Sequence, residues 1–522
     1  MKNNVIKFLS ILSAVLFICS ACTEKKTVEK ATDKSDFVQG SETLKPKKEE
    51  ISDTDEPKEL ESPTEVNNDP LDAEVILVST KEELDSVRNS LSGNFRLTKD
   101  IVFEDADFEE GGDFYNNGCG WLPIGDDDEP FSGSFDGSGF SVSNLKLDIT
   151  ENGKSGALFG RLEGGVIENL NILDCDINVF CESGDNRGLA TAAGLIAENA
   201  GTVNKCKVSG NINSYVRCDD KKNFSAAGGI CGYNYGTVSN CINEAEISSR
   251  LSLDADKNTA IKSETLNEPY VGFCYAGGIA GCDYGTVSEC TNYGSVNGET
   301  VTTNPMGLVY DQLSAGGIAG DVGYDNKVYD CDNFGNVNGS TTCGMCYTGG
   351  IAGFSNCASI ERCGNRGEIN SKVIESRDDK CASAGGISGG GEVKIKDCYN
   401  AGAITAKTVP SVDNNTEYVG LVFVGGVCSS PCEISNCYNI GKINADQICT
   451  ITGIGGIAFQ DIPEGSSGLY YLDNVSAGAS REDYATKCTD EEMRRAETYE
   501  GFDFDGVWEI DPNAEYPYPT LK

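Results

Sequence analysis

Residues 276–298 read AGGIAGCDYGTVSECTNYGSVNG, and this stretch decides the fold. Similar stretches begin at residues 192, 227, 315, 348, 384 and 424. Each copy holds three fragments of about five residues punctuated by glycine, a pattern typical of short strands rather than helices. The second glycine of the pair, or its equivalent, recurs at intervals of 30 to 49 residues. A constant frame with insertions of variable length predicts stacked coils, and hence an all-β, single-stranded parallel β-helix (β-solenoid).

Two columns of residues can be followed from copy to copy. Seven copies place a cysteine after the middle fragment: Cys206, Cys241, Cys290, Cys331, Cys363, Cys398 and Cys437. Flanking copies have Leu145, Leu170 and Val475 there, and exchange with Leu and Val is typical of a buried apolar position. Asn240 stands before its cysteine, where we expect a left-handed corner. Two residues after the cysteine, six copies carry an asparagine that we expect to stack along the coil axis: Asn243, Asn292, Asn333, Asn365, Asn400 and Asn439.

The amino terminus has the pattern of an export signal. A basic start and an apolar run end at Ser20-Ala21-Cys22, and the run is too short for a membrane span. The arrangement resembles the lipobox of bacterial lipoproteins, which implies a signal peptide over 1–21 and a lipid on Cys22. Cys19 stands where that motif usually has leucine, so cleavage of an unlipidated signal peptide is the alternative. Residues 22–74 hold the lipidated cysteine and a charged, Pro-containing tether that we expect to be disordered.

Both ends of the repeat array are predicted to be capped. Thr80 and Glu83 form a capping-box pattern, so we expect a short amphipathic helix that presents Leu84, Val87 and Leu91 and stops before Gly93. This helix and the first coils occupy 75–154, the repeats 155–478, and an aromatic, Pro-rich C-terminal cap 479–522. A cap is expected because the bare end of a solenoid promotes aggregation.

Composition limits the chemistry. The chain has 522 residues, a formal net charge of −41 and no histidine. The negative charge disfavours nucleic acid as a partner. The lack of histidine rules out Ser-His-Asp or Cys-His catalysis and HExxH zinc sites.

In its repeated segments the chain resembles the GLUG-motif repeat proteins of bacterial surfaces. The similarity lies in the GG-I-x-G and G-x-V-x-N-C-x-N patterns, in Trp121–Leu147 and in Phe502–Ile510, and spans roughly 75–522. It implies a right-handed, pectate-lyase-like parallel β-helix on the extracellular face of the bacterial membrane, held by the lipid anchor. It implies no catalytic residues.

Two groups of residues are candidates for binding. Asp126, Asp127, Asp128 and Glu129, with Asp136 nearby, are weak candidates for calcium, and a solvated turn is the alternative. The segments between copies (215–225, 250–275, 299–314, 372–383 and 407–423) are expected to be loops that leave one corner as a ridge. They carry aromatic residues suited to sugar or protein contact: Tyr215, Phe224, Tyr270, Phe273, Tyr310 and Tyr418. Packing within their own loops is the alternative.

The cysteines outside the column leave the redox chemistry open. Cys343 and Cys346 form a CxxC pair, which alone is weak support for redox or zinc chemistry. Cys231, Cys282, Cys357, Cys428 and Cys432 can form local disulfides or stay reduced.

We therefore expect a non-catalytic surface lipoprotein that binds a host or microbial glycan or protein, without a cofactor other than the calcium considered above. One alternative is a polysaccharide lyase, disfavoured because one outward strand column lacks a basic cluster: Ser143, Glu168, Asn204 or Lys205, Ser239, Ser288, Tyr329, Glu361, Lys396 and Ser435. A purely structural spacer is the other alternative.

Overall fold

The computed structural model describes residues 75–522 apart from gaps at 184–187, 219–222, 255–269, 304–308, 343, 377–379, 411, 414–415, 418–419, 431, 446–450, 460–462, 464 and 474–484. The signal segment, Cys22, the tether, Cys343, Tyr418 and Val475 lie outside the described residues. Within them, no helix is long and apolar enough to cross a membrane.

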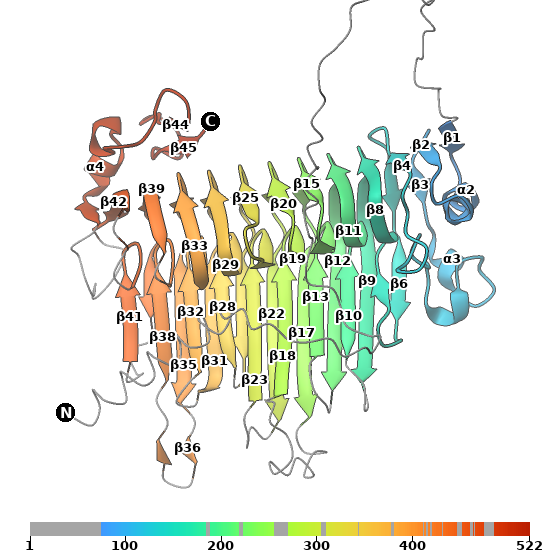
Figure 1. Ribbon diagram of the computed structural model, residues 1–522, viewed down its shortest axis with the longest axis horizontal. Helices are drawn as coiled ribbons and strands as arrows, with labels where there is room; N and C mark the ends of the chain where they lie inside the picture. The colour runs from blue at the N-terminus through green and yellow to red at the C-terminus, as the bar shows by residue number, and fades with distance from the viewer. Residues whose placement is uncertain are drawn as a thin grey trace, which may run out of the picture. The chain divides into compact units, whose positions relative to one another are not determined.

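One coil of the described chain contains five strands. They are β18 (Tyr270–Gly277), β19 (Ala280–Asp283), β20 (Thr286–Ser288), β21 (Thr291–Asn292) and β22 (Val296–Thr303). Each pairs in parallel with its equivalent in the next coil: β23 (Val309–Gly316), β24 (Ala319–Val322), β25 (Lys327–Tyr329), β26 (Asp332–Asn333) and β27 (Val337–Thr341). Figure 1 shows this stacking along the molecule. The predicted parallel β-helix is confirmed.

The remaining coils repeat this order. Strands in the place of β19 and β20 are β8 (Phe159–Glu168), β11 (Ile196–Asn204), β14 (Cys231–Asn234), β15 (Thr237–Ser239), β29 (Ala352–Glu361), β33 (Gly391–Lys396), β39 (Glu433–Asn439) and β42 (Ser467–Leu472). Those in the place of β21 are β16 (Ile242–Asn243), β30 (Gly364–Asn365) and β34 (Tyr399–Asn400).

The corner before each cysteine is left-handed. Asn240, Glu289, Asp330 and Arg362 all have φ between 49° and 56°. The cysteine that follows points into the core, and its sulfur accepts a backbone N–H of the preceding coil for which no backbone acceptor is present among the described residues. The Cys331 thiol donates to the Tyr329 carbonyl (3.2 Å), and its sulfur accepts the N–H of Cys290 (3.5 Å). Burial explains the predicted exchange with leucine, and these hydrogen bonds explain why cysteine recurs.

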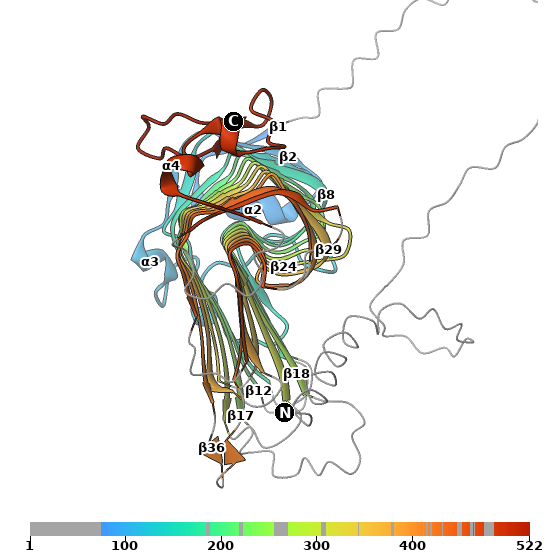
Figure 2. The same cartoon turned by 90° about the vertical axis from the view of Figure 1, so that its left-hand side faces the viewer.

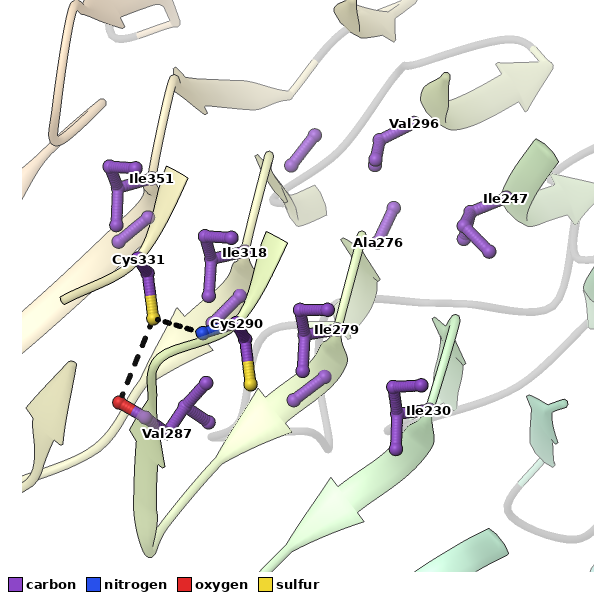
Figure 3. Close-up of a cluster of buried hydrophobic side chains, with 14 of the residues drawn as sticks. Ile230, Ile247, Ala276, Ile279, Val287, Cys290, Val296, Ile318, Cys331 and Ile351 are labelled. Carbon is purple, nitrogen blue, oxygen red and sulfur yellow. Dashed lines mark hydrogen bonds between the residues drawn. The ribbon is translucent and has the colours of Figure 1, made fainter. Parts of the chain in front are cut away.

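Figure 3 shows this part of the core. Cys290 and Cys331 lie beside the stacked isoleucines of the GG-I motif, among them Ile279, Ile318 and Ile351. All five side chains are almost completely buried. The strand register differs from the prediction at both ends of the cysteine column. Leu469, not Val475, pairs with Cys437. Leu145 lies beside Asp176 and does not hold the coil position of Leu170.

The asparagine column is a continuous ladder of buried amides. Each Nδ2 donates to the Oδ1 of the next asparagine at 2.7–2.8 Å, from Asn243 through to Asn439. A second ladder, which we did not predict, joins Asn199, Asn234 and Asp283 at the preceding corner.

The described parts of the segments between copies are strands, so the prediction of loops is wrong there, whereas the predicted continuous ridge is present. They form a two-layer extension, which we call the fin (Figure 2). One layer contains β9 (Asn171–Ser183), β12 (Lys207–Cys218), β17 (Glu246–Asp254), β22, β27, β31 (Ile369–Ser376), β35 (Ile404–Pro410) and β40 (Ile443–Ala445). The other is a nine-stranded sheet of β7 (Ser155–Gly156), β10 (Leu189–Ala193), β13 (Asn223–Gly228), β18, β23, β28 (Met345–Gly349), β32 (Cys381–Gly385), β38 (Leu421–Gly425) and β41 (Ile451–Gly455).

The fin has its own core, because alternate residues of both layers face each other. Leu251 and Leu313 are fully buried there, and the Ser225 hydroxyl lies 2.9 Å from the hydroxyls of Ser214 and Ser249. A small hairpin, β36 (Val412–Asp413) with β37 (Thr416–Glu417), adds to the described part.

Short elements cover the two ends. The predicted first helix is α2 (Lys81–Ser86) with a 3₁₀ turn Val87–Asn89; Thr80 caps it, and Leu84 and Val87 are buried. Around it lie β1 (Val75–Val78), β2 (Asn94–Leu97), β3 (Ile101–Val102), α3 (Asp105–Phe108), a 3₁₀ turn Asn116–Gly118, β4 (Ser134–Asp136), β5 (Ser141–Ser143) and β6 (Lys146–Ile149).

At the other end, the chain folds back over the tyrosines of the last coils. The elements there are β43 (Thr486–Cys488), α4 (Asp490–Met493), a 3₁₀ turn Ala496–Thr498, β44 (Trp508–Glu509) and β45 (Thr520–Leu521). Trp508 is fully buried against Tyr399 and Tyr438.

Candidate functional site

The fin meets the curved wall of the coil along the solenoid, and we call the face between them the groove. A hollow in this face is lined by residues of β18 on the fin and of β24 and β29 on the wall, strands that Figure 2 labels. The GGIAG sequence creates the groove, because the chain reverses sharply within five residues. A Cβ on Gly320, the last glycine of one copy, would lie 2.6 Å from the Gly281 carbonyl and 2.8 Å from the Ala276 nitrogen. Only glycine lets the two backbones approach this closely.

Each wall of the groove presents one column of side chains. On the curved wall, the residue directly after GGIAG or its equivalent faces outward: Glu198, Tyr233, Cys282, Asp321 and Phe354. On the fin, the facing column is Thr191, Ala226, Tyr275, Ser314 and Tyr347. Large and small residues alternate along the fin column, so the groove is filled at some rungs and open at others.

The hollow, of about 460 Å³, lies at the rung of Asp321, and none of the described residues that line it is lysine or arginine. Aromatic rings line it from both walls and the rim: Phe273, Tyr275, Tyr284, Tyr324 and Phe354. The side chains of Gln312, Asn326 and Asn356 contribute amides.

The aromatic rings continue beyond the hollow. Phe273 lies 5.2 Å from Phe224 and 5.9 Å from Tyr275 between ring centroids, while Tyr284 stacks on Tyr235 at 5.5 Å. Tyr284 and Tyr324 are 40% and 66% exposed, so their faces are open to a ligand.

Asp321 is the unusual group in the hollow. Only 9% of the residue is exposed, and within the described chain its carboxylate has no hydrogen-bond donor or cation as a partner. Burial, and then the carboxylate of Asp283, raises its pKa to about 7. Glu198, the other acid of the same column, contrasts with it because Arg161 lies 3.2 Å from its carboxylate.

Asp283 lies behind Asp321 on the neighbouring strand. It ends the second amide ladder, where its Oδ1 accepts from Asn234 (2.7 Å) and from the N–H of Gly285 (3.0 Å), while its Oδ2 is buried without a partner. Burial raises the pKa of Asp283 to about 7. A negative charge on either acid is therefore costly.

The structure separates the predicted calcium residues by their partners. Asp126 accepts the N–H groups of Asp128 (3.0 Å) and Glu129 (2.9 Å), as in a solvated turn, and Asp127 pairs with Arg161. Asp136 lies on β4, where Arg96 (3.1 Å) and Asn169 (3.1 Å) donate to its carboxylate. Across the described residues, no group of three or more acidic or cysteine side chains is arranged to hold a metal ion.

The predicted aromatic residues divide between the two faces of the fin. Phe224 and Phe273 lie on the groove side. Tyr215 lies on the other layer, where it packs on Phe180 and beneath Arg250. Tyr270 and Tyr310 are in β18 and β23, but their side chains are outside the described set.

Sequence reasoning missed Tyr233, Tyr275, Tyr284 and Asp321. The signal was present, because the residue after GGIAG is variable and chemically rich, reading Tyr233, Cys282, Asp321 and Phe354 in successive copies.

The outward column considered for a lyase is in register as predicted from Glu168 to Ser435. Asp136, not Ser143, continues it at the first coil. Lys396 is its basic member; Lys205 instead sits at a left-handed corner.

The described cysteines are free thiols, and most are buried. Of the cysteines considered for disulfides or redox chemistry, four are fully buried: Cys231, Cys282, Cys428 and Cys346 of the CxxC pair. Cys432 is also buried and lies close to Cys428. Cys357 is partly exposed and donates to Glu392 (3.2 Å).

Comparison with known proteins gives short matches. No protein-family model matches the sequence, so membership of the GLUG-motif family stays a prediction. Halomucin of Haloquadratum walsbyi is 35% identical over 112 residues, which is 20% of this chain and 1% of halomucin. A protein of Evansella cellulosilytica, named as a candidate Gly-rich membrane protein, is 34% identical over 99 residues, or 18% of this chain and 10% of that protein.

One solved structure also matches over much of the chain. It is the crystal structure of a candidate immunoglobulin A1 protease from Bacteroides ovatus, with 15% identity, a TM-score of 0.32, and coverage of 86% of this chain and 93% of that chain.

Proposed function

We propose that this protein is a surface-displayed, non-catalytic β-helix that binds a glycan in the groove beside the fin. The observation that carries the proposal is the hollow at Asp321, where aromatic rings and planar polar groups converge. Aromatic faces stack on the apolar faces of sugar rings, and carboxylate and amide groups hydrogen-bond to hydroxyl groups.

The shape of the groove favours an extended ligand. The coil repeats along one axis, so equivalent positions recur rung after rung at about 4.8 Å. Tyr233, Tyr275 and Phe354 offer rings on three of four consecutive rungs along this line. A linear oligosaccharide can contact several of them at once, whereas a compact ligand would use only the hollow.

A surface location is part of the proposal. It rests on the export signal, on Cys22 in a lipobox-like setting, and on the name of the Evansella relative, which describes a membrane protein. The charged tether over 23–74 would hold the solenoid away from the membrane.

The test is retention of the full-length chain on a panel of immobilised glycans, with and without calcium. The variant Tyr284→Ala with Tyr324→Ala removes two exposed rings at the hollow. The matched control is Tyr293→Ala with Phe334→Ala, an exposed stacked pair (5.1 Å) outside the groove.

We expect selective retention that weakens at least tenfold in the groove variant and not in the control. Retention that requires calcium would support the Asp126–Glu129 turn as a metal site. Cleavage of a bound glycan would support the lyase alternative, and lack of retention on every glycan and matrix protein would favour a spacer.

A further inference from the structure

The Asp321 hollow combines two features that together point to the charge of its ligand. Aromatic faces attract cations through their electron-rich surfaces, and a carboxylate adds a full negative charge. Of the groups lining the hollow, Asp321 is the one that ionises near neutral pH, and none is basic. An ammonium group would therefore meet no repulsion there.

The carboxylate of Asp321 also lacks a partner of its own. Buried carboxylates are normally paired with a cation or hydrogen-bonded. Asp321 is only 9% exposed, and no described residue pairs with its carboxylate or donates a hydrogen bond to it. Burial, and then the nearby charge of Asp321, raises the pKa of the Tyr275 phenol. The pKa of the Tyr284 phenol is raised by the Cys282 thiol, then by burial, and then by the charge of Asp321. Both phenols therefore stay neutral, so the ring faces remain available to a cation.

Three other charged positions among the described residues do not have this arrangement. Glu198 is paired with Arg161. Asp311 lies between the layers of the fin, where Thr302 donates to it. The polar depression at Asp136 and Lys205 has both charges and no aromatic ring. Among these positions of the described chain, the Asp321 hollow is the one where an unpaired acid and several rings coincide.

We infer that the hollow binds the ammonium group of an amino sugar, so that the glycan taken by the groove carries unacetylated glucosamine-type units. This inference rests on the proposed function, because it assigns the sugar class at one position of the same groove. The ammonium group would lie against Asp321, with the ring faces of Tyr275 and Tyr284 around it. An N-acetyl group is neutral and would give the carboxylate no positive charge to pair with.

The experiment compares two trisaccharides, one of glucosamine and one of N-acetylglucosamine, by calorimetric titration of the full-length chain at pH 7 in physiological salt. Salt suppresses general attraction of a cation to the acidic protein. The variant Asp321→Asn keeps the shape of the side chain and removes its charge. The control Glu246→Gln removes one exposed charge from the opposite layer of the fin.

We expect the wild type and Glu246→Gln to bind the glucosamine trisaccharide at least tenfold more tightly than the N-acetylglucosamine trisaccharide. Asp321→Asn should bind the two trisaccharides with similar affinity. Equal affinity for both sugars in the wild type would overturn the ammonium assignment and leave glycan binding intact. A preference that survives Asp321→Asn would also overturn it. If neither sugar nor any glycan of the panel binds, the proposed function fails and this inference fails with it.

Discussion

Replacing Asn333 with alanine removes an amide that makes three hydrogen bonds inside the coil. Its Nδ2 donates to Asn365 Oδ1 at 2.8 Å and to the Gly335 carbonyl at 2.9 Å, and its Oδ1 accepts from Asn292 at 2.8 Å. The side chain is fully buried, so water cannot replace these partners without opening the coil.

The cost follows from the groups left behind. Asn292 keeps a second acceptor, the Gly294 carbonyl, but Asn365 Oδ1 and the Gly335 carbonyl both lose the donor that Asn333 supplied. Each buried polar group left unpaired costs about 1–3 kcal/mol, so we expect a loss of about 2–6 kcal/mol in local stability.

Asn338→Ala is the matched control. Asn338 lies in the same coil and also stacks between two asparagines, Asn297 and Asn370, at 3.0 Å each. It is half-exposed on the outer face of the fin, so water can replace the lost partners, and we expect a cost below about 1 kcal/mol.

Hydrogen exchange measured by mass spectrometry suits this comparison, because a stacked array can open locally rather than in one step. Peptides spanning residues 327–341 should exchange much faster in Asn333→Ala and nearly normally in Asn338→Ala. Equal exchange in the two variants would refute the claim that buried amide pairing stabilises the coil.

Three further predictions concern stability. Cys331→Val keeps the volume but removes the sulfur that accepts the buried Cys290 N–H, so chemical denaturation should show a loss of about 1–2 kcal/mol, and an unchanged midpoint would contradict this. Gly320→Ala places a Cβ 2.8 Å from the Ala276 nitrogen, so circular dichroism should show early melting, and a wild-type melting curve would mean that the groove floor tolerates a side chain. Because the folded state raises the pKa of Asp283 and Asp321 to about 7, it binds more protons than the unfolded chain between pH 4 and 7. Stability should therefore fall as pH rises through this range, by at most about 1.4 kcal/mol per pH unit for each group, and the double Asn variant should reduce the slope.

The coil was predictable because its signals are local and repeated. Exchange of Cys206 with Leu170 in adjacent copies identifies a buried column without knowledge of its neighbours. The left-handed corner followed from Asn240, although Glu289 and Arg362 at equivalent corners show that position, rather than residue type, imposes the conformation. The Asn243 ladder followed in the same way.

The fin and the groove were harder to predict for a physical reason. The segments between copies vary in length, and their described parts, such as 250–254 and 272–275, pair with the adjacent coils, so their strand character depends on nonlocal partners. The groove depends on the angle between β18 and β19, which the close approach at Gly281 and Gly320 sets. The Asp126–Glu129 turn stood out as a charge run, whereas Asp321 is a single acid whose isolation appears only in three dimensions.

The most direct test of the account is to ask where a glycan lies when it is bound. Tyrosine nitration, read by mass spectrometry, can be compared with and without a saturating glucosamine oligosaccharide. Tyr284 and Tyr324 are 40% and 66% exposed at the hollow, and Tyr293 is 53% exposed outside the groove. We predict that the sugar protects Tyr284 and Tyr324 and leaves Tyr293 reactive. Protection of Tyr293 instead, or unchanged nitration of the two groove tyrosines at saturation, would contradict the assignment of the groove as the binding site.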